Sequence, residues 1–96
     1  MKIEYTCNNG ILYVAPEGRL DTISAPEFER FLEEQCDGIK ELTIDCEKLA
    51  YVSSAGLRVL LSAQKKLKRG MKLTNVCELV MEVFEMTGFV DVLVIA

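Results

Sequence analysis

Two adjacent serines, Ser53 and Ser54, are the side chains of this sequence best placed to do chemistry. They follow an apolar segment and precede a stretch with helical periodicity, which places them in a strand-to-helix turn. The first turn of a helix presents unpaired N–H groups and about half a positive charge, so it favours a phosphate carried on a serine. Ala55 and Gly56 are small and leave such a hydroxyl open to another protein's active site. The alternative is that one serine only caps the helix, which is worth ~1 kcal/mol.

Other reactive chemistry has little support in the residue types present. The chain has no His, the most common general base and the most common nitrogen ligand of metals. Neither nucleotide-binding pattern, GxGxxG or GxxxxGK[ST], occurs. We therefore expect a protein that is not an enzyme, with no catalytic residues, no metal and no cofactor. Since no CxxC pair is present, we expect reduced, buried thiols at all four cysteines, which are Cys7, Cys36, Cys46 and Cys77.

The chain opens with the pattern of a β-hairpin. Two alternating segments, Lys2 to Thr6 and Ile11 to Ala15, flank an Asn-Gly pair at positions 9 and 10. Asn-Gly between alternating segments is a strong signal for a tight hairpin turn. We expect Pro16 and Gly18 to close the second strand or to form a bulge near its end.

The next segment changes to helical periodicity. Ser24 stands three residues before Glu27, the spacing of a capping box, and Ile23 with Phe28 matches a hydrophobic staple. Gly38 is expected to end the helix in a left-handed conformation. The apolar face of this helix comprises Phe28, Phe31, Leu32 and Cys36.

Two further amphipathic helices follow. The first runs from the serine turn to Gly70, and its last turns carry a basic cluster that we interpret as solvated residues complementing the helix dipole: Lys65, Lys66, Lys68 and Arg69. The second begins with Asn75 and Glu78 at capping-box spacing and ends at Gly88.

Two short strands, Glu41 to Asp45 and Met71 to Thr74, are expected between the helices. A third, Val90 to Ile95, is expected after the last helix. The predicted order is therefore ββαβαβαβ. Strands that alternate with helices require crossover connections, so the fold class is α/β, with helices packed on a mixed sheet.

Length and charge limit the remaining possibilities. The 96 residues, half of them hydrophobic, predict one compact domain over residues 1–96. The formal net charge of -4 argues against direct nucleic-acid binding. Since no apolar segment is long enough for a membrane span and no export signal is recognisable, we expect a cytoplasmic protein without membrane insertion.

Three segments together resemble one known family. They are GRLD at Gly18 to Asp21, YVSSAGLRVLL at Tyr51 to Leu61, and EVFEMTGF at Glu82 to Phe89. In combination they resemble the STAS domain of bacterial anti-sigma factor antagonists, and the resemblance covers nearly the whole chain.

The resemblance implies partner switching in transcription regulation. In this family the unphosphorylated protein binds an anti-sigma factor that is also a serine kinase and thereby frees the sigma factor. Phosphorylation ends the binding, and a serine phosphatase restores it. The motif places the phosphorylated serine at Ser54, two positions before Gly56.

The resemblance also assigns neighbouring roles. Asp21 and Ser53 form the surroundings of the phosphorylation site, and the partner-binding residues are Gly56, Leu57 and Arg58. Many family members have Asp directly before the acceptor, whereas this chain has Ser53, which remains a rival acceptor.

Two expectations qualify the assignment. Many family members continue into a C-terminal helix, and we expect its absence here to alter one edge of the partner surface. The alternative function keeps the fold without the switch: a STAS adaptor subunit of a membrane transport complex, in which both serines only cap the helix.

Overall fold

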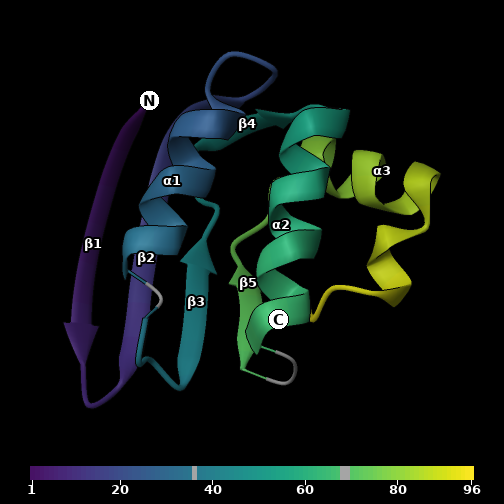
Figure 1. Cartoon of the computed structure of the whole chain (residues 1–96). Helices are drawn as coiled ribbons and strands as arrows, with labels where there is room; N and C mark the ends of the chain where they lie inside the picture. Colours follow the sequence, from purple (N-terminus) through teal and green to yellow (C-terminus); the bar gives the residue numbers. More distant parts are fainter. Residues whose placement is uncertain (36, 68–69) are drawn as a thin grey trace.

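The computed structural model describes residues 1–35, 37–67 and 70–96, which form a mixed sheet with helices against it (Figure 1). In chain order the elements are β1 (Lys2–Asn8), β2 (Ile11–Leu20), α1 (Ala25–Gln35), β3 (Glu41–Asp45), β4 (Leu49–Val52), α2 (Ser54–Leu67), β5 (Met71–Thr74), α3 (Glu78–Thr87) and a 3-10 turn η1 (Phe89–Asp91). The strand order is β1-β2-β3-β5, and β4 pairs with the carboxyl end of β2. The predicted α/β class with a mixed sheet is confirmed.

The opening hairpin forms as the Asn-Gly pair predicts. Asn9 and Gly10 both have positive φ, 54° and 80°, as a tight hairpin turn requires. Pro16 does not close β2, because the strand continues to Leu20, but the alternative of a bulge near the end of the strand agrees with a register shift between Gly18 and Arg19. β2 pairs with β3 as far as Val14 and with β4 from Gly18. Pro16, which has no N–H to donate, falls between these two partners, so the ladder tolerates it.

The core lies between the sheet and the pair α1 and α2, which stand side by side on one face (Figure 1). Alternate residues of the strands point into it, and Phe28 and Leu32 of α1 meet them from the helix side. The strand contribution comes from Leu12, Val14, Leu42, Ile44, Met71 and Leu73, each at most 1% exposed. These side chains fix the sheet relative to the helices, and therefore fix the strand ends relative to the helix N-termini.

The start of α1 differs from the predicted capping box. Ser24 precedes the helix, but its hydroxyl donates to the carbonyl O of Arg19, 2.6 Å away, and accepts the Asp21 N–H. Glu27 instead contacts the N-terminal amino group at 3.1 Å. The hydrophobic staple is also wrong, because Ile23 is 88% exposed. Hydrogen bonds within the turn, which helical spacing cannot reveal, direct these side chains.

The start of α3 also differs from its predicted capping box. Cys77 occupies the N-cap position, and no side chain caps the helix there. Asn75 has a φ of 54°, and its side-chain N–H donates to the Asp45 carboxylate at 3.0 Å. A tertiary partner at the end of β3 has therefore taken the side chain that spacing assigned to the helix. The predicted end at Gly88 is confirmed, with a left-handed φ of 78°.

The predicted last strand, 90–95, does not form. Gly88 turns the chain into η1, and the segment returns to the sheet only as a single bridge between Leu73 and Ile95. Leu93 is buried there, while Val92 and Val94 are about half exposed. Conversely, β4 is a strand that the predicted order does not contain. It has four residues and one strand neighbour, too little for an alternation signal.

The cysteines divide by position. Cys46 is buried and Cys77 half-buried, but Cys7 is exposed on β1, so the expectation of a buried thiol is wrong there. β1 is an edge strand, and most of its residues face solvent. Cys36, Lys68 and Arg69 lie outside the described residues, so the roles predicted for them stay predictions.

Candidate functional site

The two serines have different environments. Ser53 is the residue before α2: its carbonyl O accepts the Leu57 N–H at 2.9 Å, and its Oγ accepts the Gly56 N–H at 3.3 Å. This is the bonding of an N-cap. Ser54 is the first residue of the helix and is exposed, and across the described residues no hydrogen bond engages its hydroxyl. The geometry gives the capping role to Ser53 and leaves the Ser54 Oγ open to solvent.

Parallel pairing of β2 with β4 positions this turn. Arg19 pairs with Tyr51 and Leu20 with Val52, and the Ser53 N–H donates to the Leu20 carbonyl O at 2.9 Å. Both strands therefore end at the same level, and the residues that follow them come to one edge. The Asp21 turn and the serine turn are brought together there, as the GRLD and SSAGLR segments predict.

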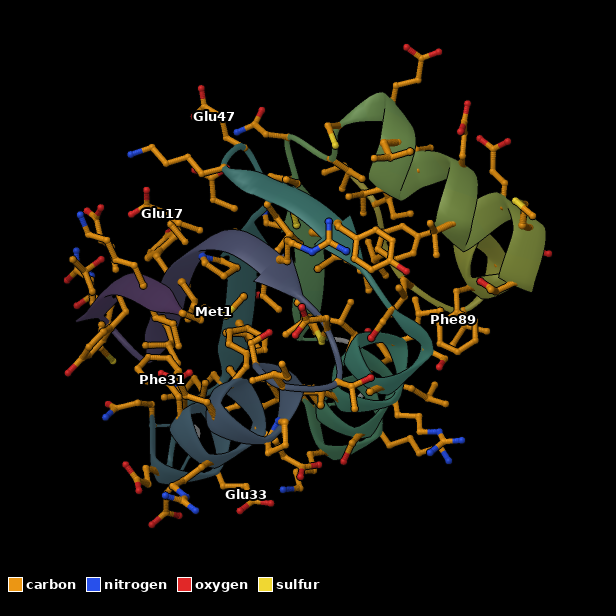
Figure 2. The ribbon with its side chains drawn as sticks, turned by 90° about the horizontal axis from the view of Figure 1, so that it is seen from above. Met1, Glu17, Phe31, Glu33, Glu47 and Phe89 are labelled. Atoms are coloured by element: carbon orange, nitrogen blue, oxygen red, sulfur yellow. The ribbon has the colours of Figure 1, made fainter. Side chains whose placement is uncertain are left out.

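This edge is also where α1 and α2 begin, at the top of Figure 1, and Figure 2 looks onto it from above. Phe31 and Glu33 lie on the side of α1 in that view, and Glu47, from the turn between β3 and β4, lies on the opposite side. The carboxyl ends of parallel strands and the N-termini of the helices that follow them make the usual ligand or partner surface of an open α/β sheet.

Asp21 organises its own turn. Its Oδ1 accepts the N–H groups of Ile23 and Ser24, at 3.0 Å and 3.1 Å. The Ser24 N–H is the largest cause that holds the pKa of the Asp21 carboxyl below its ordinary value; the Ile23 N–H, the Ser24 hydroxyl and the Arg19 charge act in the same direction, and desolvation opposes them. Asp21 is thus an ionised turn-forming residue beside the serine turn.

Arg19 closes the same edge from the strand side. Its guanidinium lies 4.3 Å from the centre of the Tyr51 ring, and its Nε lies 3.8 Å from the Asp21 carboxylate. The ring belongs to the residue that faces Arg19 across the β2–β4 pair. This cation–π contact joins the two turns on their outer surface.

Of the three residues predicted to bind the partner, only Arg58 is exposed. Gly56 is buried: a Cβ on it would lie 2.7 Å from the Leu20 carbonyl O and 2.8 Å from the Leu20 Cγ. Leu57 is 4% exposed and belongs to the core. Gly56 and Leu57 thus hold α2 against β2, and Arg58 is the residue of this group that presents a side chain to solvent.

Sequence reasoning missed Ile23 as a surface residue. Its backbone N–H is held by Asp21, while its side chain is 88% exposed at the start of α1. A hydrogen-bonded turn that follows β2 therefore presents a branched apolar side chain to solvent. The staple pattern predicted that Ile23 packs against Phe28, and no other feature of the sequence marks Ile23 as a surface residue.

The remaining chemistry of this region is limited. Burial is the main cause that raises the pKa of the Cys46 thiol to about 12, with the charges of Asp45 and Cys77 acting in the same direction. Cys46 is therefore a protonated, unreactive thiol at neutral pH. No cluster of three His, Cys, Asp or Glu side chains that could hold a metal ion occurs in the described part of the chain. The helices described also include none long and apolar enough to span a bilayer.

The chain matches the STAS domain family over residues 2–96. It belongs to the STAS-domain family of anti-sigma factor antagonists. It is 35% identical, over 100 residues, to a Bordetella bronchiseptica protein named as the anti-sigma factor antagonist BtrV; the match covers 100% of this chain and 86% of that protein.

Solved structures show that the fold of this STAS protein is shared. An anti-sigma factor antagonist from Thermotoga maritima superposes with a TM-score of 0.88 at 16% identity, over 97% of this chain and 84% of that one. The unphosphorylated form of the anti-sigma factor antagonist SpoIIAA superposes with a TM-score of 0.81 at 17% identity, over 99% and 88%. SpoIIAA of Bacillus is also known in a phosphorylated form, with a TM-score of 0.74, 16% identity and coverage of 99% and 91%.

Proposed function

We propose that this STAS protein is an anti-sigma factor antagonist that works by partner switching. Its unphosphorylated form binds an anti-sigma factor that is also a serine kinase, and the sigma factor is released. Phosphorylation of Ser54 ends that binding, and a serine phosphatase restores it. All these steps take place in the cytoplasm. The protein itself is a binding partner and a kinase substrate, not an enzyme.

The observation that supports this assignment is the difference between the two serine hydroxyls. The Ser54 Oγ is exposed at the start of α2, whereas the Ser53 Oγ accepts the Gly56 N–H as a cap. In the transfer step the Ser54 Oγ attacks the γ-phosphorus of ATP held by the kinase. The bond from that phosphorus to the bridging oxygen breaks, ADP leaves, and a base of the kinase takes the hydroxyl proton. Ser53 would first have to give up its cap.

One phosphate can supply the change in affinity that a switch needs. A thousandfold loss of affinity corresponds to ~4 kcal/mol. A phosphoserine carries a charge of about -1.5 to -2, and burying such a group without new donors costs several kcal/mol. Because Ser54 is on the surface, this effect is local and requires no refolding of the domain.

The surface around Ser54 defines the partner contact that we propose. Ile23 offers an apolar side chain and Arg58 a cation, one from the turn before α1 and the other from the first turns of α2. Asp21 keeps the turn that carries Ile23 in place through its two N–H hydrogen bonds. Gly56 and Leu57 do not touch the partner in this proposal; they pack against the core and so fix the position of α2. Replacing Ile23 with Ser is expected to weaken partner binding about tenfold, with folding unchanged.

The first test is intact-mass spectrometry of the protein from its own cells, with fragmentation across residues 51–58. A phosphate on Ser54 under at least one growth condition is the expected result. A phosphate on Ser53 would refute the residue assignment. No phosphate under any condition would refute the switch and would favour the transport-complex adaptor.

The second test uses three variants as baits in the same cells. Ser54→Ala is expected to retain an ATP-binding anti-sigma factor, and Ser54→Asp is expected to lose it. Ser53→Ala is the matched control, because it removes a neighbouring hydroxyl and should still be phosphorylated. Equal recovery of the kinase by the Ala and Asp variants of Ser54 would contradict the proposal, as would recovery of transporter subunits in its place.

A further inference from the structure

We propose that Arg58 binds the phosphate of phosphorylated Ser54 within the same helix, so that this STAS protein carries its own phosphate-binding side chain. The inference rests on the proposed function for the presence of the phosphate. It concerns a pair of side chains on α2, Ser54 and Arg58, and the chemical group bound is a phosphate monoester. The GRLD and SSAGLR segments locate the acceptor serine, and they assign no phosphate-binding role to Arg58.

The helix places these two residues on one face. Ser54 and Arg58 are four residues apart, so they are neighbours along the helix surface. Among residues 54–58 they are the two that are exposed, since Ala55 is half-buried and Gly56 and Leu57 are buried. Side chains on a helix lean toward its N-terminus, so the long Arg58 side chain can reach the position of Ser54. The acidic group then precedes the basic one, which is the favourable order.

Arg58 is also available for this contact. The ion pairs among the described residues join the N-terminal amino group to Glu27, Lys2 to Glu17, and Arg19 to Asp21, so Arg58 has no carboxylate partner within that part of the chain. The sequence of α2, SAGLRVLLSAQKKL, contains no acidic residue that could compete for it.

The two charged residues at the end of β2, Arg19 and Asp21, are already paired. Arg19 stacks on Tyr51 and lies 3.8 Å from the Asp21 carboxylate, whose Oδ1 accepts two N–H groups of its own turn. Asp21 repels a phosphate and Arg19 is held by its partners, whereas Arg58, four residues from Ser54 on the same helix, is free to turn toward the phosphate. A guanidinium can meet two phosphate oxygens at once, which a single ammonium cannot do with the same geometry.

The pairing gives phosphorylation a second effect. The phosphate adds negative charge at Ser54 and also occupies the Arg58 guanidinium, which is then no longer available to bind the partner. The unphosphorylated protein offers a cation to its partner, and the phosphorylated protein offers a neutralised pair with net negative charge. Loss of the Arg58 contact then adds to the remaining cost of burying a pair with net negative charge.

The test uses the full chain with phosphoserine installed at position 54 by genetic encoding, followed by ³¹P NMR across the second phosphate ionisation. Arg58 favours the dianion, so the second pKa of the phosphate is expected to rise by about 0.3 to 0.5 units in Arg58→Gln, a two- to threefold change in proton affinity. Arg58→Lys should recover part of this shift. Arg30→Gln is the matched control, because Arg30 is an exposed arginine on α1, and it should leave the pKa unchanged.

A second pKa in Arg58→Gln that agrees with the unsubstituted protein within about 0.1 unit would overturn the inference. Equal shifts in the Arg58→Gln and Arg30→Gln variants would also overturn it, because they would show a general charge effect. The result is separable from the proposed function, since the phosphoserine is installed by genetic encoding and does not depend on the cellular kinase. If cells never phosphorylate Ser54, the proposed switch fails even where the NMR shift is present; if they do and the shift is missing, only the pairing fails.

Discussion

Replacing Gly56 with Ala tests whether α2 depends on close approach to β2. A Cβ at this position would lie 2.7 Å from the Leu20 carbonyl O, a backbone atom, and 2.8 Å from the Leu20 Cγ. Overpacking of this kind costs about 1–3 kcal/mol, while the better helix propensity of Ala returns about 1 kcal/mol. Because the backbone oxygen cannot rotate away, we place the overpacking cost in the upper part of this range, at about 2–3 kcal/mol, and expect a net loss of about 1–2 kcal/mol in the free energy of unfolding.

Urea unfolding followed by circular dichroism measures this loss. With a slope of about 2 kcal/mol per M, typical of a small protein, the urea midpoint is expected to fall by roughly 0.5–1 M. The control is Ser54→Ala, another alanine in α2, at an exposed position where the change should stay within about 0.5 kcal/mol.

The same substitution should also affect the serine turn. The Leu20 carbonyl O that a Cβ would meet is the acceptor of the Ser53 N–H, so moving α2 away from β2 disturbs that 2.9 Å hydrogen bond. Gly56→Ala is therefore expected to be phosphorylated more slowly as well as to unfold more easily. A midpoint that is unchanged or raised would refute the reasoning, because it would mean that the helix does not press on Leu20.

Three further outcomes follow from the geometry. Ser53→Ala should lower the free energy of unfolding by ~1 kcal/mol through loss of the cap, and Ser54→Ala should not; equal urea midpoints for the two variants would contradict the assignment of the cap. The pKa of Asp21 lies below its ordinary value in the folded protein, so its ionised form stabilises the fold above about pH 4, and this stabilisation is lost as the pH falls through the folded pKa. The difference in the free energy of unfolding between the unsubstituted protein and Asp21→Asn should therefore narrow on acidification. A difference independent of pH would contradict a stabilising role of the ionised carboxyl. Burial raises the pKa of Cys46 to about 12, so at pH 8 a thiol reagent should label Cys7 in the folded protein and Cys46 only after unfolding, as peptide mass spectrometry can show; rapid labelling of Cys46 would contradict its burial.

Features that depend on local residue patterns could be predicted from the sequence. The Asn9-Gly10 hairpin, the left-handed helix end at Gly88 and the mixed sheet all appear in the structure. Each has a local cause: a turn that needs positive φ, a helix that ends where only glycine is unstrained, and strands that alternate with helices. The serine turn belongs with them, because the helical periodicity that follows the two serines fixes its place along the chain.

Features that depend on contacts between distant segments could not be predicted from the sequence. The side chain of Asn75 bonds to Asp45 and leaves the cap of α3 empty, and Ile23 points to solvent although its spacing fits a staple. β4 exists because β2 continues past Pro16 and offers it an edge. The predicted last strand is reduced to one bridge at Ile95, since the turn after Gly88 leaves too little chain alongside β5.

The sequence by itself determined the family, the order of most elements and the pair of serines that could accept a phosphate. The motif favoured Ser54 as the acceptor but left Ser53 as a rival, since the two adjacent serines share one turn. The tertiary structure separated them: the Leu20 carbonyl anchors the Ser53 N–H, and the Ser53 Oγ turns inward to cap Gly56, while Ser54 faces solvent. It also showed that Gly56 and Leu57, two of the residues predicted to bind the partner, are buried, whereas Arg58 is exposed. Burial and hydrogen-bond partners arise from the packing of α2 against β2, and such contacts between distant segments are not encoded in the spacing of residues along the chain.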